Sequence, residues 1–381
     1  MKTPSLGYVP VCAAMLVLSS CGGSSSEPAP TPRPRWTEAQ ADSWYAAQPW
    51  LVGANFVPST AVNQLEMWQA GTYDEATIDR ELGWAADLGF NTMRVFLHDL
   101  LWKEDSEAFL DRIDRFLALA DQHGITVMLV FFDGVWNPFP VAGEQPDPIP
   151  HVHNSQWVQS PGAEILGDFE RHDELKPYVK GVVGRFRSDP RVLAWDLFNE
   201  PDNPNILSYA EVELPPEAKE PAAEALLQKA FMWARSVDPT QPLTVGVWEG
   251  EWGDPGGLSP LNELMLLESD VVSFHSYAPP DAVQDLVEDL QQYGRPLLCT
   301  EYLARPVGST FETVLPIFDA RGVGAYNWGL VSGRTQTIYA WLSWVTMDPA
   351  EADPWFHDIF HPDGAPYDPG EVALIQDLTG S

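Results

Sequence analysis

The feature that most constrains the fold is an eightfold alternation of short apolar runs and longer helical patterns that begins near Trp50. Each run has the length and the β-branched or apolar character of a strand. The predicted strands cover residues 51–56, 92–97, 126–132, 192–198, 243–248, 271–275, 296–301 and 324–328. Strands that alternate with helices predict an α/β fold, and eight such units predict a closed (β/α)8 TIM barrel.

The segments between the predicted strands show helical spacing. Residues 74–88 and 107–123 are amphipathic, and Gly89 and Gly124 follow them, where a left-handed residue commonly ends a helix. A doubly wound open sheet is the alternative fold. However, the first predicted strand contains only Gly53, whereas dinucleotide-binding sheets carry a Gly-rich phosphate loop there. The pattern therefore favours the barrel.

One domain accounts for residues 36–381, because no composition shift divides this part of the chain. The connection 133–169 is long, aromatic and Pro-rich, and long connections after barrel strands usually shape the site. The formal net charge of -34 would repel phosphate backbones and argues against a nucleic-acid partner. The 16 tryptophans offer flat apolar faces that suit sugars.

Two glutamates occupy the ends of predicted strands on opposite sides of the barrel. Glu200 follows the fourth strand in the sequence Asn-Glu-Pro, and Glu301 ends the seventh. Barrel enzymes place their reacting groups at these strand ends. Glycosidic bond cleavage needs one carboxyl group to protonate the leaving oxygen and one carboxylate facing the anomeric carbon. This pair therefore predicts a glycosidase site that requires no cofactor.

Five motifs in order on the expected strands resemble glycoside hydrolase clan A, and family 5 in particular, over residues 50–378. They are Arg94 on the second strand, Asn199-Glu200-Pro201 on the fourth, His275-Ser276-Tyr277 on the sixth, Glu301 on the seventh and Trp328 on the eighth. The resemblance implies that Glu200 is the acid/base, that Asn199 binds the sugar 2-hydroxyl and that Glu301 is the nucleophile. It also implies that Arg94 and Tyr277 hydrogen-bond Glu301, with His275 as a supporting group and Trp328 as a sugar platform.

The third predicted strand departs from the family pattern, which commonly has a histidine at its end. Asp133 and Trp136 stand there instead, and we expect both to support the site. His98, just beyond Arg94, could supply the polar contact or be purely structural. Asn199 and Glu200 would point to opposite faces of a regular strand, so both reach the site only if the strand end is irregular. Pro201 favours an extended backbone at Glu200.

Other polar and aromatic residues admit more than one interpretation. Trp248 ends the fifth predicted strand and is expected to contact substrate. His151 and His153 have a spacing that could ligate a metal, but no third ligand is evident, and we expect no metal site. Asp196 lies inside a strand and is expected to make structural hydrogen bonds. Cys299 lies in an apolar run and is expected to be a buried, inert thiol.

The N-terminus resembles a bacterial lipoprotein leader. Residues 9–18 are apolar but too short to span a bilayer, and Leu-Ser-Ser precedes Cys21. The resemblance implies that residues 1–20 are a signal peptide and that Cys21 is lipidated. Residues 21–35 then form a Gly-, Ser- and Pro-rich tether. We expect a cell-envelope lipoprotein at the outer membrane or cell surface, held to the membrane by the lipid alone.

The sequence therefore predicts a monomeric retaining glycoside hydrolase that cleaves β-linked glucan- or mannan-type oligo- or polysaccharides by double displacement. In a retaining enzyme the two carboxyl groups lie roughly 5–5.5 Å apart. A transglycosylase and a xylan-specific enzyme are alternatives on the same fold. A surface lipoprotein that binds glycan without cleaving it is an alternative of another class, although a binder has no use for two carboxylates directed at one bond.

Overall fold

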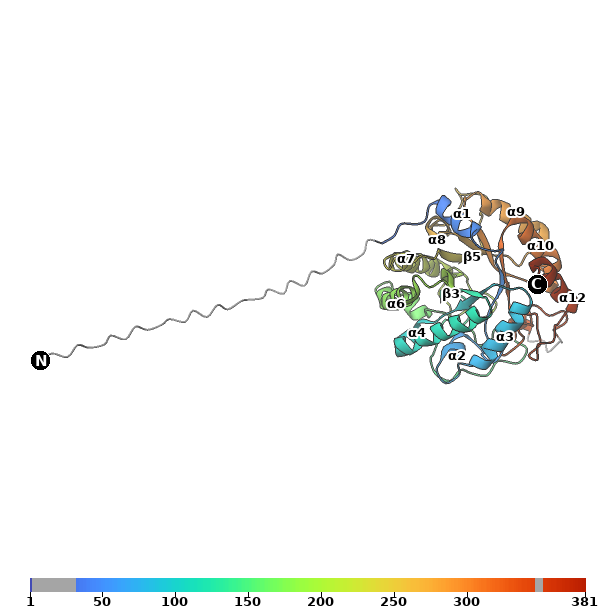
Figure 1. Ribbon diagram of the computed structural model, residues 1–381, viewed down its shortest axis with the longest axis horizontal. Helices are drawn as coiled ribbons and strands as arrows, with labels where there is room; N and C mark the ends of the chain where they lie inside the picture. The colour runs from blue at the N-terminus through green and yellow to red at the C-terminus, as the bar shows by residue number, and fades with distance from the viewer. Residues whose placement is uncertain (2–31, 347–351) are drawn as a thin grey trace. The chain divides into compact units, whose positions relative to one another are not determined.

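Eight parallel strands form a closed barrel in sequential order in the computed structural model, which describes residue 1, residues 32–346 and residues 352–381. Figure 1 shows the helices encircling these strands. The strands are β1 Val52–Asn55, β2 Thr92–Phe96, β3 Thr126–Asp133, β4 Val192–Asn199, β5 Leu243–Val247, β6 Val272–His275, β7 Leu297–Tyr302 and β8 Gly324–Trp328. The predicted barrel is confirmed, and each predicted strand end agrees to within one residue.

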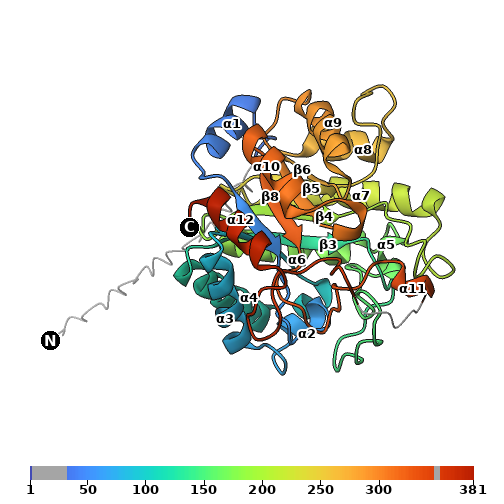
Figure 2. The ribbon, with the colours of Figure 1, turned by 90° about the vertical axis from the view of Figure 1, so that its right-hand side faces the viewer.

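The helices lie outside the barrel (Figure 2). They are α1 Glu38–Ala46, α2 Gln64–Trp68, α3 Glu75–Asp87, α4 Asp99–Gln122, α5 Ala163–Leu166, α6 Lys176–Phe186, α7 Pro216–Arg235, α8 Pro260–Glu268, α9 Pro280–Gln291, α10 Phe311–Arg321, α11 Ser343–Thr346 and α12 Pro369–Thr379. Helix α1 precedes β1, α2 to α10 lie between consecutive strands, and α11 and α12 follow β8. Two short 3-10 helices cover His172–Leu175 and Arg305–Val307. Gly89 and Gly124 have positive φ after α3 and α4, as predicted.

The core follows from the two-residue alternation of the strands. Leu129 of β3 and Trp195 of β4 belong to the main apolar cluster that the outer helices cover. Their neighbours Met128 and Ala194 belong to a second cluster that also contains Ala41 of α1. One strand face thus packs on the helices and the other fills the barrel, and α1 packs on the cluster that fills it.

The folded part begins before Trp36, the residue at which the sequence-based domain boundary was placed. Arg33 forms an ion pair of 2.6 Å with Asp270, and Arg35 donates to the carbonyl oxygens of Ser269 and Leu266. The end of the predicted tether is therefore bound to the barrel. The predicted signal peptide and Cys21 lie outside the described residues. In the described part of the chain, no helix is long and apolar enough to cross a membrane.

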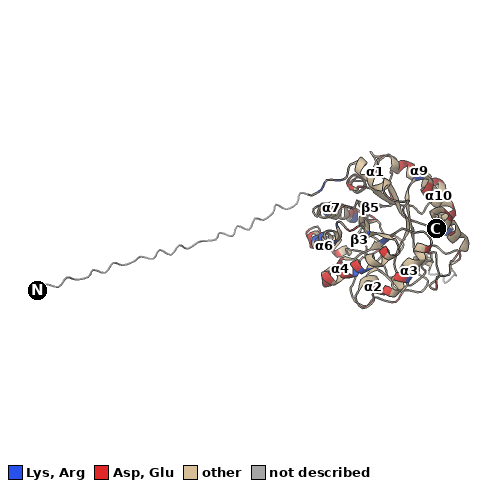
Figure 3. Cartoon of the chain, viewed as in Figure 1, with Lys and Arg blue, Asp and Glu red and all other residues tan. Residues whose placement is uncertain are grey.

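Acidic residues occur on several of the outer helices, including α3, α4 and α9 (Figure 3). The whole chain carries 55 Asp and Glu against 21 Lys and Arg. Such a surface keeps a protein soluble and repels polyanions. The excess negative charge is therefore a property of the surface as well as of the sequence.

Candidate active site

A cavity of about 550 Å³ opens where the connections after the strands meet. Nine of the residues that the sequence singled out for the site line it: Asp133, Trp136, Asn199, Glu200, Trp248, His275, Tyr277, Glu301 and Trp328. They come from six different strand ends or the connections that follow them. The cavity is therefore where a barrel of this type places its chemistry.

Glu200 reaches the cavity because the end of β4 is irregular. The register between β4 and β5 shifts between Asp196 and Asn199, and Glu200 has a left-handed backbone with a φ of 42°. Asn199 and Glu200 therefore both line the cavity, as the predicted irregularity requires. The expected extended backbone at Glu200 is wrong. Pro201 biases the residue before it toward an extended backbone, and the observed φ of Glu200 shows that the local fold overrides this bias.

A glycine on the neighbouring strand end makes room for this irregular turn. A Cβ atom built on Gly134 would lie 2.3 Å from the carbonyl oxygen of Glu200. The amide of Gly134 donates to the carbonyl oxygen of Asn199 at 2.9 Å. Only a residue without a side chain allows the two backbones to approach so closely.

Glu301 is buried and held by two donors. Nη1 of Arg94 lies 2.8 Å from its Oε1, and the hydroxyl of Tyr277 donates to its Oε2 at 2.7 Å. Both contacts agree with the geometry that the resemblance implied. Hydrogen bonds from a cation and a phenol stabilise the ionised carboxylate and fix its orientation.

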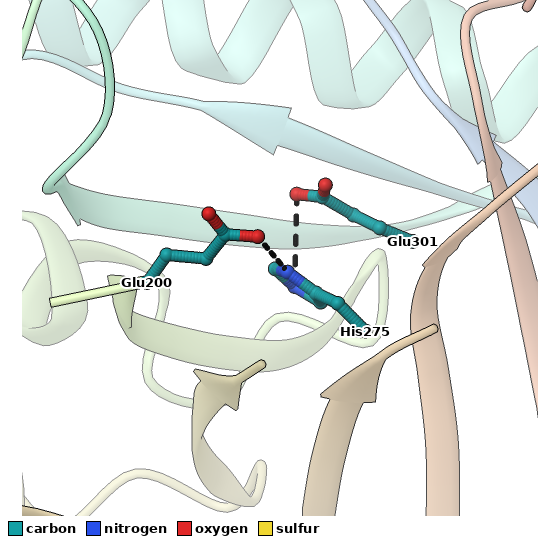
Figure 4. Close-up of side chains that lie close together, drawn as sticks. All are labelled: Glu200, His275 and Glu301. Carbon is teal, nitrogen blue, oxygen red and sulfur yellow. Dashed lines mark hydrogen bonds and ion pairs between the residues drawn. The ribbon is translucent and has the colours of Figure 1, made fainter. Parts of the chain in front are cut away.

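His275 lies between the two glutamates (Figure 4). Its Nδ1 is 2.6 Å from Oε1 of Glu200, and its Nε2 is 3.6 Å from Oε1 of Glu301. One oxygen of each glutamate and one ring nitrogen of His275 all lie within 4.8 Å of one another. The two carboxyl groups are therefore close neighbours in the cavity, with the ring of His275 in contact with Glu200 and near Glu301.

Arg94 connects Glu301 to the residues below the cavity. It is fully buried, and its guanidinium donates to Asp196, Asn55 and Asn199 as well as to Glu301. Asp196 accepts two of these hydrogen bonds at 2.9 and 2.8 Å, which agrees with its expected structural role. The positive charge of Arg94 is thus balanced by the carboxylates of Asp196 on β4 and Glu301 on β7.

Asp133, at the end of β3, orients Asn199 from the other side. Nδ2 of Asn199 donates to Oδ1 of Asp133 at 3.0 Å, and Nε1 of Trp157 donates to Oδ2 at 2.6 Å. Arg94 donates to the side-chain oxygen of Asn199, so both ends of this amide are fixed. Burial raises the pKa of Asp133 to about 7. A supporting role for Asp133 is consistent with these contacts.

Burial has the largest effect on the pKa values of the ionisable side chains in the site. Burial raises the pKa of Glu200 to about 7, although the hydrogen bond from Asn203 opposes the rise. Burial and the charge of Glu200 also raise the pKa of Glu301, while His275, Arg94 and Tyr277 oppose this. Burial lowers the pKa of His275 to about 4, so this ring is neutral near neutral pH.

Aromatic side chains form much of the cavity wall. Trp328 packs edge-on against Phe96 and Trp157, which hold its ring in place. Trp136 is stacked on Trp344 at a centroid distance of 5.7 Å. Trp248 is half-buried and donates to Asp202 at 2.7 Å. Flat rings with fixed orientations can stack on the apolar faces of sugars.

The structure shows what His98, His151 and His153 contact. His98 is buried, does not line the cavity, and accepts a hydrogen bond from the amide of Leu100 as the N-cap of α4. Of the two roles considered for His98, the structural one agrees with this position. His151 and His153 contact the hydroxyl and the carbonyl oxygen of Tyr339, respectively. Cys299 is buried, as predicted.

Several lining residues were missed by the sequence analysis. Asn203 donates to Oε2 of Glu200 at 2.6 Å, and Trp341 packs edge-on against Tyr277 at 4.8 Å. His357 also lines the cavity. A polar residue three positions after Glu200 was the only available signal for Asn203. Nothing in the sequence marked Trp341 among 16 tryptophans.

Glu200, His275 and Glu301 also have the residue types and spacing of a metal site. However, both oxygens of Glu301 already accept hydrogen bonds, and the guanidinium of Arg94 lies 2.8 Å from one of them. A cation bound there would be repelled by Arg94. The donor set therefore suits carboxylate chemistry better than metal chemistry.

A (β/α)8 barrel with two facing, buried glutamates at its mouth defines the class of barrel glycoside hydrolases. The pattern of the cellulase family, glycosyl hydrolase family 5, matches residues 57–330. The chain therefore belongs to glycosyl hydrolase family 5.

One relative and two solved structures illustrate what the chain is similar to. Mannan endo-1,4-beta-mannosidase 1 of Solanum lycopersicum is 27% identical over 197 residues, which cover 45% of this chain and 44% of the relative. The match thus spans less than half the length of this relative. GH5_18 from Streptomyces cattleya in complex with GlcNAc is 15% identical, with a TM-score of 0.60 over 86% of this chain and 79% of that one. The endo-beta-1,4-mannanase from Thermotoga petrophila is 16% identical, with a TM-score of 0.55 over 88% and 77%. These two structures share the fold.

Proposed function

We propose that this protein is a retaining glycosidase that cleaves β-linked glycans by double displacement, with Glu301 as nucleophile and Glu200 as acid/base. The observation that carries the proposal is the position of the two carboxyl groups, whose nearest ligand oxygens lie within 4.8 Å. Retaining enzymes separate these groups by about 5–5.5 Å, whereas inverting enzymes need about 6.5–9.5 Å to admit a water molecule.

In the first step, Glu301 attacks the anomeric carbon while the bond to the leaving oxygen breaks. That oxygen takes the proton of Glu200, and the sugar remains bound to Glu301 as an ester. In the second step, Glu200 takes a proton from water, and the water oxygen displaces Glu301 from the anomeric carbon. The pKa of about 7 suits a group that gives and then accepts a proton near neutral pH.

The surrounding contacts support this division of roles. Arg94 and Tyr277 donate to Glu301 and favour its ionised form, as a nucleophile requires. Among the residues that the structure describes, no Lys or Arg lies within hydrogen-bonding distance of Glu200, and only Asn203 and His275 contact its carboxyl oxygens. The two glutamates are therefore in different environments, which separates an acid from a nucleophile.

For the substrate, we propose a β-1,4-linked glycan of manno-type, with a gluco-type chain as the second candidate. The proposal is supported by the mannan-cleaving relatives and by the aromatic lining formed by Trp136, Trp248 and Trp328.

We further propose that the protein is a cell-envelope lipoprotein anchored through Cys21. This second proposal is supported by the Leu-Ser-Ser-Cys sequence alone.

The roles can be tested with an activated aryl β-glycoside and azide. Glu301→Ala should lose hydrolysis, and azide should enter the vacated space and give a glycosyl azide of inverted configuration. Glu200→Ala should still form the ester with a good leaving group, and azide should then give the retained configuration. Opposite anomers by NMR are the expected result.

Glu251→Ala is a matched control, because Glu251 is exposed and does not line the cavity. It should hydrolyse the substrate at the rate of the unaltered protein and give no azide product. The same anomer from both active-site variants would contradict the role assignment.

A further inference from the structure

Two long connections join across one side of the cavity. The first follows β3 and the second follows β8. The amide of Asn154 donates to the carbonyl oxygen of Thr335 at 2.8 Å, and the amide of His151 donates to Oε1 of Gln336 at 2.8 Å. Nε2 of Gln336 donates back to the carbonyl oxygen of Ile149 at 2.6 Å. The two connections are therefore one connected layer, not independent loops.

Trp344 links this layer to a third connection, the one that follows β4. Its Nε1 donates to the carbonyl oxygen of His153 at 2.7 Å, and its ring is stacked on Trp136. The ring of Tyr209, from the connection after β4, packs edge-on against Trp344 at 5.3 Å. We call the joined connections after β3 and β8, residues 134–162 and 329–346, the wall. Tyr209 packs against this wall from the connection after β4.

The wall separates the cavity from the ends of β1 and β2. In the described ranges, no residue of the connections after β1 and β2 lines the cavity. Phe96, at the end of β2, is covered by Trp157 and Trp328, with ring centroids 5.2 and 5.8 Å away. A chain of sugars therefore has no path across this side of the barrel mouth.

The opposite side of the cavity faces solvent. Trp248 is half-buried, Glu249 is exposed, and Ile206 is 73% exposed. Glu200 lies next to this side, because its amide donates to the carbonyl oxygen of Gly246 on β5 and its carboxyl group contacts Asn203. Since Glu200 must protonate the leaving oxygen, the leaving sugar lies on the open side. The sugar that becomes bound to Glu301 lies on the walled side.

From this arrangement we propose that the protein removes single sugars from the non-reducing end of β-linked chains. The inference rests on the proposed retaining function and deepens it. An enzyme that cuts internal bonds needs room for sugars on both sides of the cleaved bond. Here the leaving part can be a chain of any length, whereas the glycosyl part must be one terminal sugar. The named relatives include endo-acting mannosidases, so the wall assigns this chain a different mode of action.

The test uses the full chain with β-1,4-linked manno- and glucohexaose that carry a fluorescent tag at the reducing end. Removal of terminal sugars should give untagged monosaccharide and a tagged series that shortens one sugar at a time. Tagged mono- to trisaccharides among the first products would overturn the proposal. No cleavage of either hexaose, or of aryl β-glycosides, would instead contradict the proposed function, so the two failures are distinguishable.

A wall variant tests the cause. Trp344→Ala removes the stack on Trp136 and the hydrogen bond to His153, and should produce untagged di- and trisaccharides early in the reaction. Trp44→Ala is the matched control, because Trp44 is also half-buried but packs in the cluster around α1. It should keep the single-sugar pattern. A Trp344→Ala protein that folds by circular dichroism and keeps this pattern would refute the role of the wall. The wild-type product series remains decisive if that variant fails to fold.

Discussion

At the scale of single residues, Arg94 determines much of the site geometry. Its planar guanidinium donates to Glu301 and Asn199 in the cavity and to Asp196 and Asn55 below it. A lysine has one point charge and cannot bridge four acceptors in one plane. The sequence predicted the contact with Glu301 through the family resemblance. The contacts with Asn55 and Asn199 could not be predicted, because they depend on the register of neighbouring strands.

The pKa of Glu200 gives the first prediction. The acid must be protonated in the first chemical step, so kcat/KM should fall as the pH rises through about 7. Asn203 donates to Oε2 and stabilises the carboxylate, which lowers the pKa of Glu200 relative to burial alone. Asn203→Ala should therefore raise this pKa and move the alkaline limb of the kcat/KM profile to higher pH.

Asn137→Ala provides the control for this profile. Asn137 lies in the connection after β3, where its side-chain oxygen accepts a hydrogen bond from the amide of Phe139. Asn137 does not line the cavity. The alkaline limb should stay where it is in this variant. A shift to lower pH in Asn203→Ala would show that Asn203 does not stabilise the ionised Glu200.

At the scale of elements, the strands and their bounds could be predicted, but the left-handed backbone at Glu200 after β4 and the pairing of the long connections could not. The runs of apolar residues located all eight strands, because buried parallel strands have few polar positions. The helix predicted from residue 107 corresponds to the second part of α4, which follows the non-helical Asp105 with a φ of -158°; the first part, which begins at Asp99, was not predicted. The wall joins residues about 180 positions apart, such as Asn154 and Thr335, and such pairings leave no local pattern.

A buried ion pair holds two of the connections that surround Glu200. Nζ of Lys219, on α7, lies 3.0 Å from Oε2 of Glu213, and neither side chain is more than 2% exposed. The same Nζ donates to the carbonyl oxygens of Gly134 and Asn203. The pair therefore links the ends of β3 and β4, where Glu200 takes its left-handed conformation.

Lys219→Met should lower the free energy of unfolding by about 3–5 kcal/mol, because it leaves the buried carboxylate of Glu213 without a countercharge. Urea denaturation measures the loss. Lys229→Met on the same helix is the control. Lys229 is 30% exposed and pairs with Asp173 at 3.1 Å, so its loss should cost at most about 1 kcal/mol. Equal losses for the two variants would contradict a special role for the buried pair.

At the scale of the whole molecule, the barrel and the acidic surface were both evident from the sequence. Eight repeated units leave few ways to close a parallel sheet, which explains why the fold could be predicted without a relative. The proposed mode of action, which is the removal of terminal sugars, could not be predicted from the sequence, since it depends on which side of the cavity the wall covers.

Lipidation of Cys21 is the prediction that concerns the whole chain. A single acyl chain binds membranes only marginally, whereas two or more acyl chains on one thiol and its amino terminus give stable anchoring. Cys21→Ser removes the thiol that would carry the lipid. When expressed in a Gram-negative host, the variant should therefore remain unlipidated, should no longer partition into the detergent phase, and should keep the 20-residue leader.

Cys12→Ser is the matched control, because Cys12 lies inside the apolar stretch and is not preceded by Leu-Ser-Ser. That variant should be processed and should partition like the unaltered protein. If Cys21→Ser instead partitions and migrates as the unaltered protein does, the thiol carries no lipid and the protein reaches its location by another route.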